Sequence, residues 1–192
     1  MNATEYAGRL RDPFGELLSA PVEFRGELSL QLADAERIAE VCAFAKQQLG
    51  FDFLLDITSL DHYGADPRWS IVYHLYGLGH RCHLRLKTDV SEEKSELPTV
   101  TGVWRTADWH EREIYDMMGV RFRGHPDLRR IIMWEGYPYF PLRKDFPVTG
   151  KPSDLPDVAF SRPAPIEGGP FVTRPGGRDA TEREPRVRMP GD

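Results

Sequence analysis

The side chains best suited to chemistry gather in one stretch in the second half of the sequence. They are carboxylates, arginines and a histidine at short intervals: Glu111, Arg112, Glu113, Asp116, His125, Arg129 and Arg130. On a helix, Arg112 would lie one turn from both Asp108 and Asp116, and one guanidinium can donate to two carboxylates. We therefore expect a partly buried ion-pair network that fixes the following loop. In it, Arg112 is at least half buried and paired with Asp116 or another carboxylate.

The same residues allow two other interpretations. One is an ordinary solvated helix face, whose exposed ion pairs contribute at most about 1 kcal/mol each. The other is a hydrolase whose acid and base come from Glu111, Glu113, Asp116 and His125. The sequence has neither a Gly-x-Ser-x-Gly nucleophile motif nor a phosphate-binding loop. It therefore favours a protein with no catalytic residue of its own.

A metal site is the remaining chemical interpretation. If residues 69–87 form a hairpin with the two-residue loop Leu78-Gly79, His74 and His83 lie directly opposite each other. Two ligands without a fixed third make a poor zinc site, and Cys42 and Cys82 cannot supply the four thiolates of an iron–sulfur cluster. We therefore expect no metal and no cofactor in this chain.

The elements that must position these residues follow from the spacing of apolar side chains. Alternating patterns predict four strands, at residues 22–32 with a bend near Gly26, 51–60, 69–76 and 81–87. Helical patterns predict helices at 34–49, capped by Asp34 and ended by Gly50, and at 109–118, capped by Asp108 and ended by Gly119, with more helix after Pro98. The predicted fold class is α+β. We expect a two-layer domain with a mixed, largely antiparallel sheet packed by helices, plus an extended C-terminal tail.

Regular patterning ends after Phe140, which divides the chain into a domain of residues 1–149 and a tail of residues 150–192. The tail holds eight prolines and six glycines in 43 residues, with scattered apolar side chains such as Phe160 and Phe171. We interpret it as a strap that wraps a partner subunit. An extended ribbon precedes it, and we expect the order of both to depend on the partner. The ribbon residues assigned to the partner interface are Pro141, Leu142, Arg143, Lys144, Asp145, Phe146 and Pro147.

Composition narrows the class of protein further. The chain has 40% hydrophobic and 29% charged residues, which suits one folded globular domain of this length. With 25 basic and 30 acidic residues, its net charge of −5 gives no electrostatic footprint for nucleic acid or anionic lipid. The sequence contains no run of about 18 apolar residues, and its start does not resemble a signal peptide. We therefore expect a cytoplasmic protein that recognises its partners by shape and local charge.

Residues 104–147 closely resemble the signature of the type-C subunits of respiratory complex I, the thirty-kilodalton subunit family of NADH:quinone oxidoreductase. The matching features are Glu-Arg-Glu at 111–113, then Asp116, His125 and Arg129, and the run Pro-Leu-Arg-Lys-Asp-Phe-Pro at 141–147. This signature covers about a quarter of the chain. Because it is long and chemically unusual, chance is a poor explanation for the match.

The resemblance implies a cofactor-free structural subunit of the quinone-reducing module in the hydrophilic arm. Electron transfer from NADH to quinone and proton translocation would belong to the assembly, with FMN, iron–sulfur clusters and quinone held by other subunits. The implied chief partner is the type-D subunit of complex I, with the type-B and type-I subunits and the flavin-side type-G subunit nearby. The implied location is peripheral, on the cytoplasmic side of the bacterial inner membrane. The alternative is the equivalent subunit of an energy-converting hydrogenase or of a ferredoxin- or F420-linked oxidoreductase.

Overall fold

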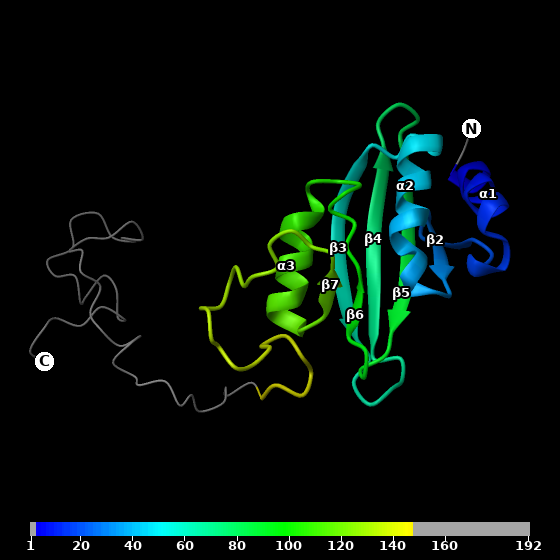
Figure 1. Cartoon of the computed structure of the whole chain (residues 1–192). Helices are drawn as coiled ribbons and strands as arrows, with labels where there is room; N and C mark the ends of the chain where they lie inside the picture. Colours follow the sequence, from blue (N-terminus) through cyan, green and yellow to red (C-terminus); the bar gives the residue numbers. More distant parts are fainter. Residues whose placement is uncertain (1–2, 148–192) are drawn as a thin grey trace, which may run out of the picture. The chain divides into compact units, whose positions relative to one another are not determined.

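The computed structural model describes residues 3–147, and these contain a five-stranded sheet (Figure 1). Its strands stand in the order β1-β2-β5-β4-β3, and only the pairing of β2 with β5 is parallel. Their bounds are Val22–Phe24 for β1, Glu27–Leu32 for β2, Phe53–Asp61 for β3, Trp69–Gly77 for β4 and Cys82–Val90 for β5. The α+β fold with a mixed, largely antiparallel sheet is therefore confirmed.

The strand predicted at residues 22–32 is instead a tight hairpin. Arg25 (φ 53°) and Gly26 (φ 81°) both take left-handed backbone angles and reverse the chain, so that Val22 pairs with Ser29. A two-residue loop with positive φ at both positions matches the right-handed twist of the strands that it joins. The glycine therefore allows a full reversal of the chain where the sequence pattern indicated only a bend.

The hairpin of β4 and β5 has a longer loop than predicted. Four residues separate the paired Gly77 and Cys82, which shifts the register by two, so that His74 lies opposite Arg85 and His83 opposite Tyr76. The predicted pairing of the two histidines is therefore wrong. The loop is long because His80 folds back under it, where its Nε2 atom lies 3.1 Å from the carbonyl oxygen of Leu49. Within residues 3–147, no three His, Cys, Asp or Glu side chains are placed to hold a metal ion.

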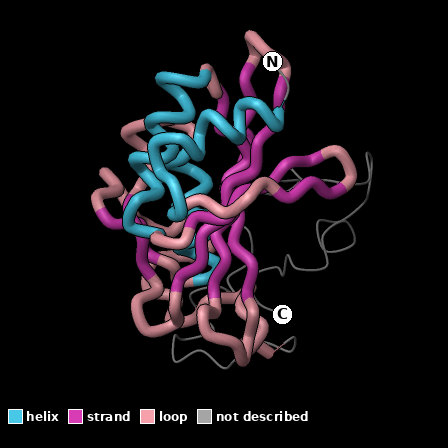
Figure 2. The backbone as a smooth tube through the Cα atoms, turned by 90° about the vertical axis from the view of Figure 1, so that its right-hand side faces the viewer, coloured by secondary structure: helices cyan, strands magenta, loops and turns pink. Residues whose placement is uncertain are grey.

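Helices lie on one side of the sheet (Figure 2). Their bounds are Ala3–Phe14 for α1, Ile38–Leu49 for α2 and Ala107–Met118 for α3, with short 3-10 turns at Gly15–Leu17 and Ala35–Arg37. The side chain of Asp34 accepts the N–H of Glu36 at 3.0 Å, but it caps the 3-10 turn at Ala35–Arg37, so α2 itself begins at Ile38 and not directly after Asp34. Gly50 (φ 74°) ends α2 as the sequence predicted. The core lies between these layers, where a row of buried side chains crosses the sheet: Leu30, Leu86, Tyr73 and Ile57.

The segment after Pro98 departs from the prediction of helix. Strand β6 (Glu96–Pro98) pairs in parallel with β7 (Arg121–Arg123), and turns fill residues 99–106. Helix α3 begins at Ala107, so Asp108 lies in its first turn and is not the N-cap, while Gly119 (φ 78°) ends the helix as expected. Helix α3 packs beside the edge strand β3 (Figure 1). No helix of residues 3–147 has the length and apolar character needed to cross a membrane.

The β4–β5 loop gives a direct test of this packing. A methyl group at Gly77 would collide with the His80 ring and would lie 2.8 Å from the carbonyl oxygen of Gly50, whereas a methyl group at Gly79 meets nothing within 4 Å. We therefore expect Gly77→Ala to lower the free energy of unfolding by about 1–3 kcal/mol. Gly79→Ala is the matched control and should change it by less than about 0.5 kcal/mol. Urea denaturation of both variants decides the matter, and equal midpoints would contradict this account of the loop.

Candidate functional site

Asp116, near the C-terminal end of α3, is fully buried and organises the loop that follows β7. Its Oδ2 atom accepts three successive backbone N–H groups, from Ile131 at 3.0 Å, Ile132 at 2.7 Å and Met133 at 2.9 Å. Its Oδ1 atom accepts Nη1 of Arg130 at 2.6 Å. Burial alone would raise the pKa of Asp116, but these donors outweigh burial and lower it. The carboxylate is therefore a permanent anion that holds a loop in place.

Arg130 carries this attachment into the next turn of the chain. Its Nη2 atom donates to the carbonyl oxygens of Tyr137 at 2.7 Å and Tyr139 at 3.3 Å, and its guanidinium lies 5.1 Å from the centre of the Phe140 ring. Because one guanidinium serves both the helix and the loop, residues 130–140 are fixed relative to α3.

Arg112 is buried as predicted, with 7% of its surface exposed, but its partners differ from those predicted. Its Nε atom donates to the carbonyl oxygen of Arg129 at 3.2 Å, and its guanidinium lies over the ring of Trp109 at 5.1 Å. The predicted pair with Asp116 is wrong, because Arg130 from the loop occupies that carboxylate. The structure thus supports a buried network, centred on Asp116 and Arg130.

Glu111 and His125 form a second part of the network. Glu111 is fully buried, and its two oxygens accept the N–H of Val100 at 2.7 Å and the hydroxyl of Thr99 at 2.5 Å. Nε2 of His125 lies 4.0 Å from Oε2 of Glu111 and 3.3 Å from Oδ1 of Asp108. Burial, opposed by the bonds from Thr99 and Val100, raises the pKa of Glu111 to about 7. Glu111 therefore titrates in the physiological range.

Two of the predicted network residues lie outside this buried cluster. Glu113 points to solvent from α3, and Arg129 is exposed, with its Nε atom 2.9 Å from Oδ2 of Asp127. Their side chains behave as the solvated helix and loop faces that the sequence left as an alternative.

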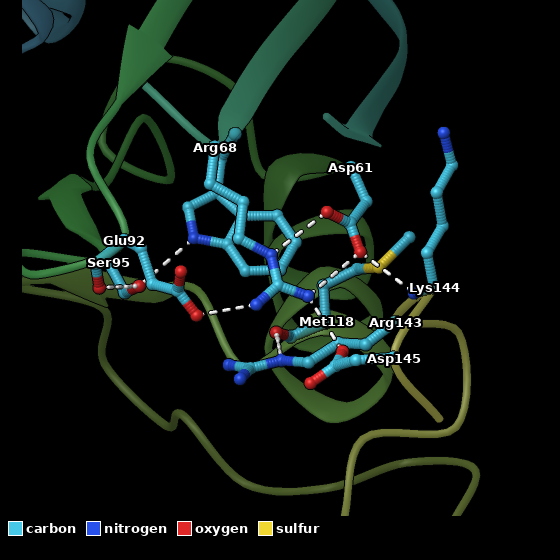
Figure 3. A network of polar contacts seen from close by, with 9 residues as sticks. Asp61, Arg68, Glu92, Ser95, Met118, Arg143, Lys144 and Asp145 are labelled. Atoms are coloured by element: carbon cyan, nitrogen blue, oxygen red, sulfur yellow. Dashed lines mark hydrogen bonds and ion pairs between the residues drawn. The ribbon is translucent and has the colours of Figure 1, made fainter. Parts of the chain in front are cut away.

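A second buried charge, which the sequence did not reveal, is the guanidinium of Arg68, which lies where β3 ends and β4 begins (Figure 3). Arg68 is almost fully buried and donates to both carboxylate oxygens of Asp61, at 2.9 and 3.1 Å. It also donates to Glu92 at 2.5 Å and to Asp145 at 2.7 Å. Asp61, with Asp145 and Glu92, raises the pKa of Arg68, so its charge is permanent. No local spacing could reveal this cluster, because its members come from four separate segments of the chain.

The ribbon of residues 141–147 is attached to this cluster and to α3. Nε of Arg143 donates to the carbonyl oxygen of Met118 at 2.6 Å, and the N–H of Lys144 donates to Oδ2 of Asp61 at 2.8 Å (Figure 3). The ribbon thus has contacts with its own domain, and the dependence of its order on a partner stays a prediction. The tail, with Phe160 and Phe171, lies outside the described residues.

The network's residues belong to a segment that matches a known family. The family model for the 30-kDa subunit of respiratory-chain NADH dehydrogenase matches residues 32–152. A type-C subunit of the NADH-quinone oxidoreductase of Rhizobium meliloti is 52% identical over 134 residues, which cover 69% of this chain and 73% of that protein. The type-C subunit of Geotalea uraniireducens is 43% identical over 142 residues, covering 74% and 86%. The chain belongs to this 30-kDa subunit family, as its signature segment indicated.

Two solved structures share the fold. A trypsin-resistant fragment, residues 1–134, of Nqo5 superposes with a TM-score of 0.57 at 34% identity, covering 64% of this chain and 99% of that one. A chain of the membrane-bound sulfane sulfur reductase, an archaeal respiratory membrane complex, gives a TM-score of 0.64 at 23% identity, covering 75% and 85%. The second likeness shows the fold alone.

The buried anion of Asp116 leads to a stability prediction. In Asp116→Asn, the amide's NH2 group would face either Arg130 or the N–H groups of residues 131–133, leaving donors without an acceptor. We expect a loss of about 3–5 kcal/mol in the free energy of unfolding, because one member of a buried pair is removed. Glu113→Gln, on the exposed face of the same helix, is the control and should stay within about 0.5 kcal/mol of the original protein. Similar denaturation curves for the two variants would contradict the assigned role of Asp116.

A second prediction concerns the pH dependence of stability. Because folding raises the pKa of Glu111 from 4.5 to about 7, its protonated form is favoured in the folded state. This contribution is fully present below about pH 4.5 and is lost as the pH rises through 7. Glu111→Gln mimics the protonated form, so its stability relative to the original protein should rise by up to about 3 kcal/mol between pH 5 and pH 8. Chemical denaturation at both pH values measures this difference, and parallel pH profiles would show that Glu111 does not titrate as described.

Proposed function

We propose that this chain is a structural subunit without a cofactor in the quinone-reducing module of a proton-translocating NADH:quinone oxidoreductase. The proposal rests on one observation: the charged groups of the signature form hydrogen bonds to other parts of the same chain. Asp116 accepts three N–H groups and a guanidinium, Arg112 bonds a backbone carbonyl, and Arg143 bonds the end of α3. These contacts bury Asp116 with both of its oxygens already accepting protein donors, which leaves it poorly placed to act as an acid or base on a substrate. They favour a scaffold role over the hydrolase alternative.

The scaffold presents apolar side chains outward from the same segment. Ile132 is 59% exposed although its backbone N–H is bonded to Asp116, and Trp109 and Leu142 are comparably exposed. Exposed side chains on a rigidly held loop suit docking to a neighbouring protein, because little conformational entropy is lost on binding. We therefore assign the loop and the ribbon to an interface with the type-D subunit. The type-B, type-I and type-G subunits would lie nearby, with FMN, iron–sulfur clusters and quinone in other subunits of a peripheral arm on the cytoplasmic side of the inner membrane.

The related reductases and hydrogenases remain the second candidate. The fold likeness to a chain of the archaeal sulfane sulfur reductase supports it, while relatives named as NADH-quinone oxidoreductase subunits at 52% and 43% identity favour the first. The two candidates differ in the neighbouring subunits and not in the chemistry of this chain.

A pair of surface variants tests the scaffold role. Ile132→Asp places a charge on the proposed interface, and Leu78→Asp places one on the β4–β5 loop at a similar exposure of 57%. Both isolated proteins should melt within about 2 °C of the original, because neither side chain is buried. In cells lacking the original gene, Ile132→Asp should reduce co-purification with the type-D subunit and NADH:quinone activity at least about tenfold, the effect of a hot-spot loss above 1.4 kcal/mol. Leu78→Asp should leave both unchanged. Normal assembly of the Ile132→Asp protein would refute this interface.

A further inference from the structure

The hairpin of β1 and β2 exposes two large apolar side chains that the core of the domain does not use. Val22 and Phe24 are 62% and 64% exposed. They stand opposite Ser29 and Glu27, on the face of the sheet away from the buried Leu28. No helix in the described part of the chain covers that face (Figure 2). The two side chains therefore form an apolar patch at the edge of an open sheet face.

The hairpin extends beyond the main sheet. Strand β2 pairs with β5 only from Ser29 onward, so the turn and the two residues after it lie past the end of that pairing. The hairpin stands out from the sheet on the side away from the helices (Figure 2). In the strand order β1-β2-β5-β4-β3 it occupies one edge, whereas α3 packs beside the other. A contact at the hairpin is therefore separate from the interface proposed around Ile132.

The backbone at the outer edge of β1 is poorly suited to adding a strand from a partner. In a hairpin with a two-residue loop, the residues that flank the loop, here Phe24 and Glu27, form a hydrogen-bonded pair. Because these backbone groups alternate along a strand, Glu23 is the residue of β1 that directs its N–H and C=O outward. The next outward position is Pro21, which has no N–H to donate. A partner must therefore be recognised by the side chains of the hairpin.

Arg25, in the turn of the hairpin, is an unpaired cation beside the apolar patch. Its guanidinium lies 5.2 Å from the centre of the Phe24 ring, and it forms no ion pair within the described part of the chain. Glu27, on the other side of the turn, is paired with Arg85 instead. The backbone of Arg25 has φ 53°, a conformation that favours Asn and Gly at this turn position and strains an arginine. The turn itself therefore gains nothing from an arginine, whereas arginine and aromatic side chains are enriched in protein interfaces.

We propose that the β1–β2 hairpin docks to another protein subunit, whose surface offers an apolar pocket for Val22 and Phe24 and a carboxylate at the rim for Arg25. The two apolar side chains supply the contact area. Covering the Phe24 ring also removes water from the guanidinium beside it, which strengthens the attraction of that cation to an acidic group. The carboxylate distinguishes this partner from other apolar surfaces. This inference does not rest on the proposed function, because the hairpin lies at the other edge of the sheet from α3.

Hydroxyl-radical footprinting tests whether a partner covers the hairpin. The full chain is labelled alone and in the assembly that is purified through an affinity tag on this chain. Labelling of Phe24 should fall at least about fivefold in the assembly, as for a side chain that enters a desolvated pocket. Labelling of Leu78, which is 57% exposed on the β4–β5 loop, is the control and should stay unchanged.

Two footprinting results would overturn the proposal. One is labelling of Phe24 that is the same in the assembly as in the isolated chain. The other is a Phe24 side chain that is already protected in the isolated chain, because then the chain itself or a second copy of it covers the hairpin.

Charge reversal tests the carboxylate. Arg81→Glu is the matched control for Arg25→Glu, because Arg81 is also exposed, also has φ 53° and lies in the loop of the β4–β5 hairpin. Arg25→Glu should return the labelling of Phe24 in the assembly to that of the isolated chain, or lower the recovery of the assembly about tenfold. Arg81→Glu should change neither quantity. Equal effects of the two reversals would overturn the proposal.

Arg25→Asn separates docking from folding. Asparagine suits the turn better than arginine but carries no charge, so the isolated variant should melt at the same temperature as the original protein or higher. The same variant should lose the protection of Phe24 in the assembly. A variant that melts normally and keeps this protection would show that Arg25 has no role in docking, which would overturn the proposal.

Discussion

The arrangement of the second half of this protein depends on the cost of burying one carboxylate. An ionised group removed from water loses several kcal/mol of solvation, which only well-placed donors can offset. Asp116 has no surface exposure, and the donors that it needs come from residues 130–133. The loop must therefore fold around the end of α3 wherever the helix is formed. The position of residues 130–133 against α3 follows from this electrostatic requirement.

The same requirement operates a second time at Arg68. Here the buried group is a cation, and its donors reach carboxylates from β3, from the segment after β5 and from the ribbon. Asp145 supplies its carboxylate from 77 residues further along the chain. The two buried charges thus hold one stretch of chain, from Arg130 to Asp145, at its two ends. That stretch keeps its place although it contains no regular secondary structure.

Local patterns in the sequence predicted those elements whose boundaries are set by nearby residues. Gly50 ends α2 as expected, and Asp34 caps the 3-10 turn that leads into α2, because a cap and a left-handed terminator act on residues within one turn. The same patterns failed where distant segments decide. Arg112 and Asp116 stand one helical turn apart, yet Asp116 pairs with Arg130 from the loop. Arg68 has no sequence signal, because its partner carboxylates come from distant parts of the chain. His80 packs under the loop between β4 and β5 and makes that loop longer than predicted. The alternation of apolar and polar residues along the strands cannot reveal such a tertiary contact.

The parallel pairing of β2 with β5 has a consequence for the order in which the protein is made. Leu30 stands beside Leu86, so the strand made early in synthesis must wait for one that emerges more than fifty residues later. The antiparallel strands β3, β4 and β5 are neighbours in sequence and can form a sheet at once. During translation, the apolar face of β2 and of helix α2 therefore remains uncovered until the centre of the sheet exists. That interval is when a nascent chain is most exposed to aggregation and most in need of a chaperone.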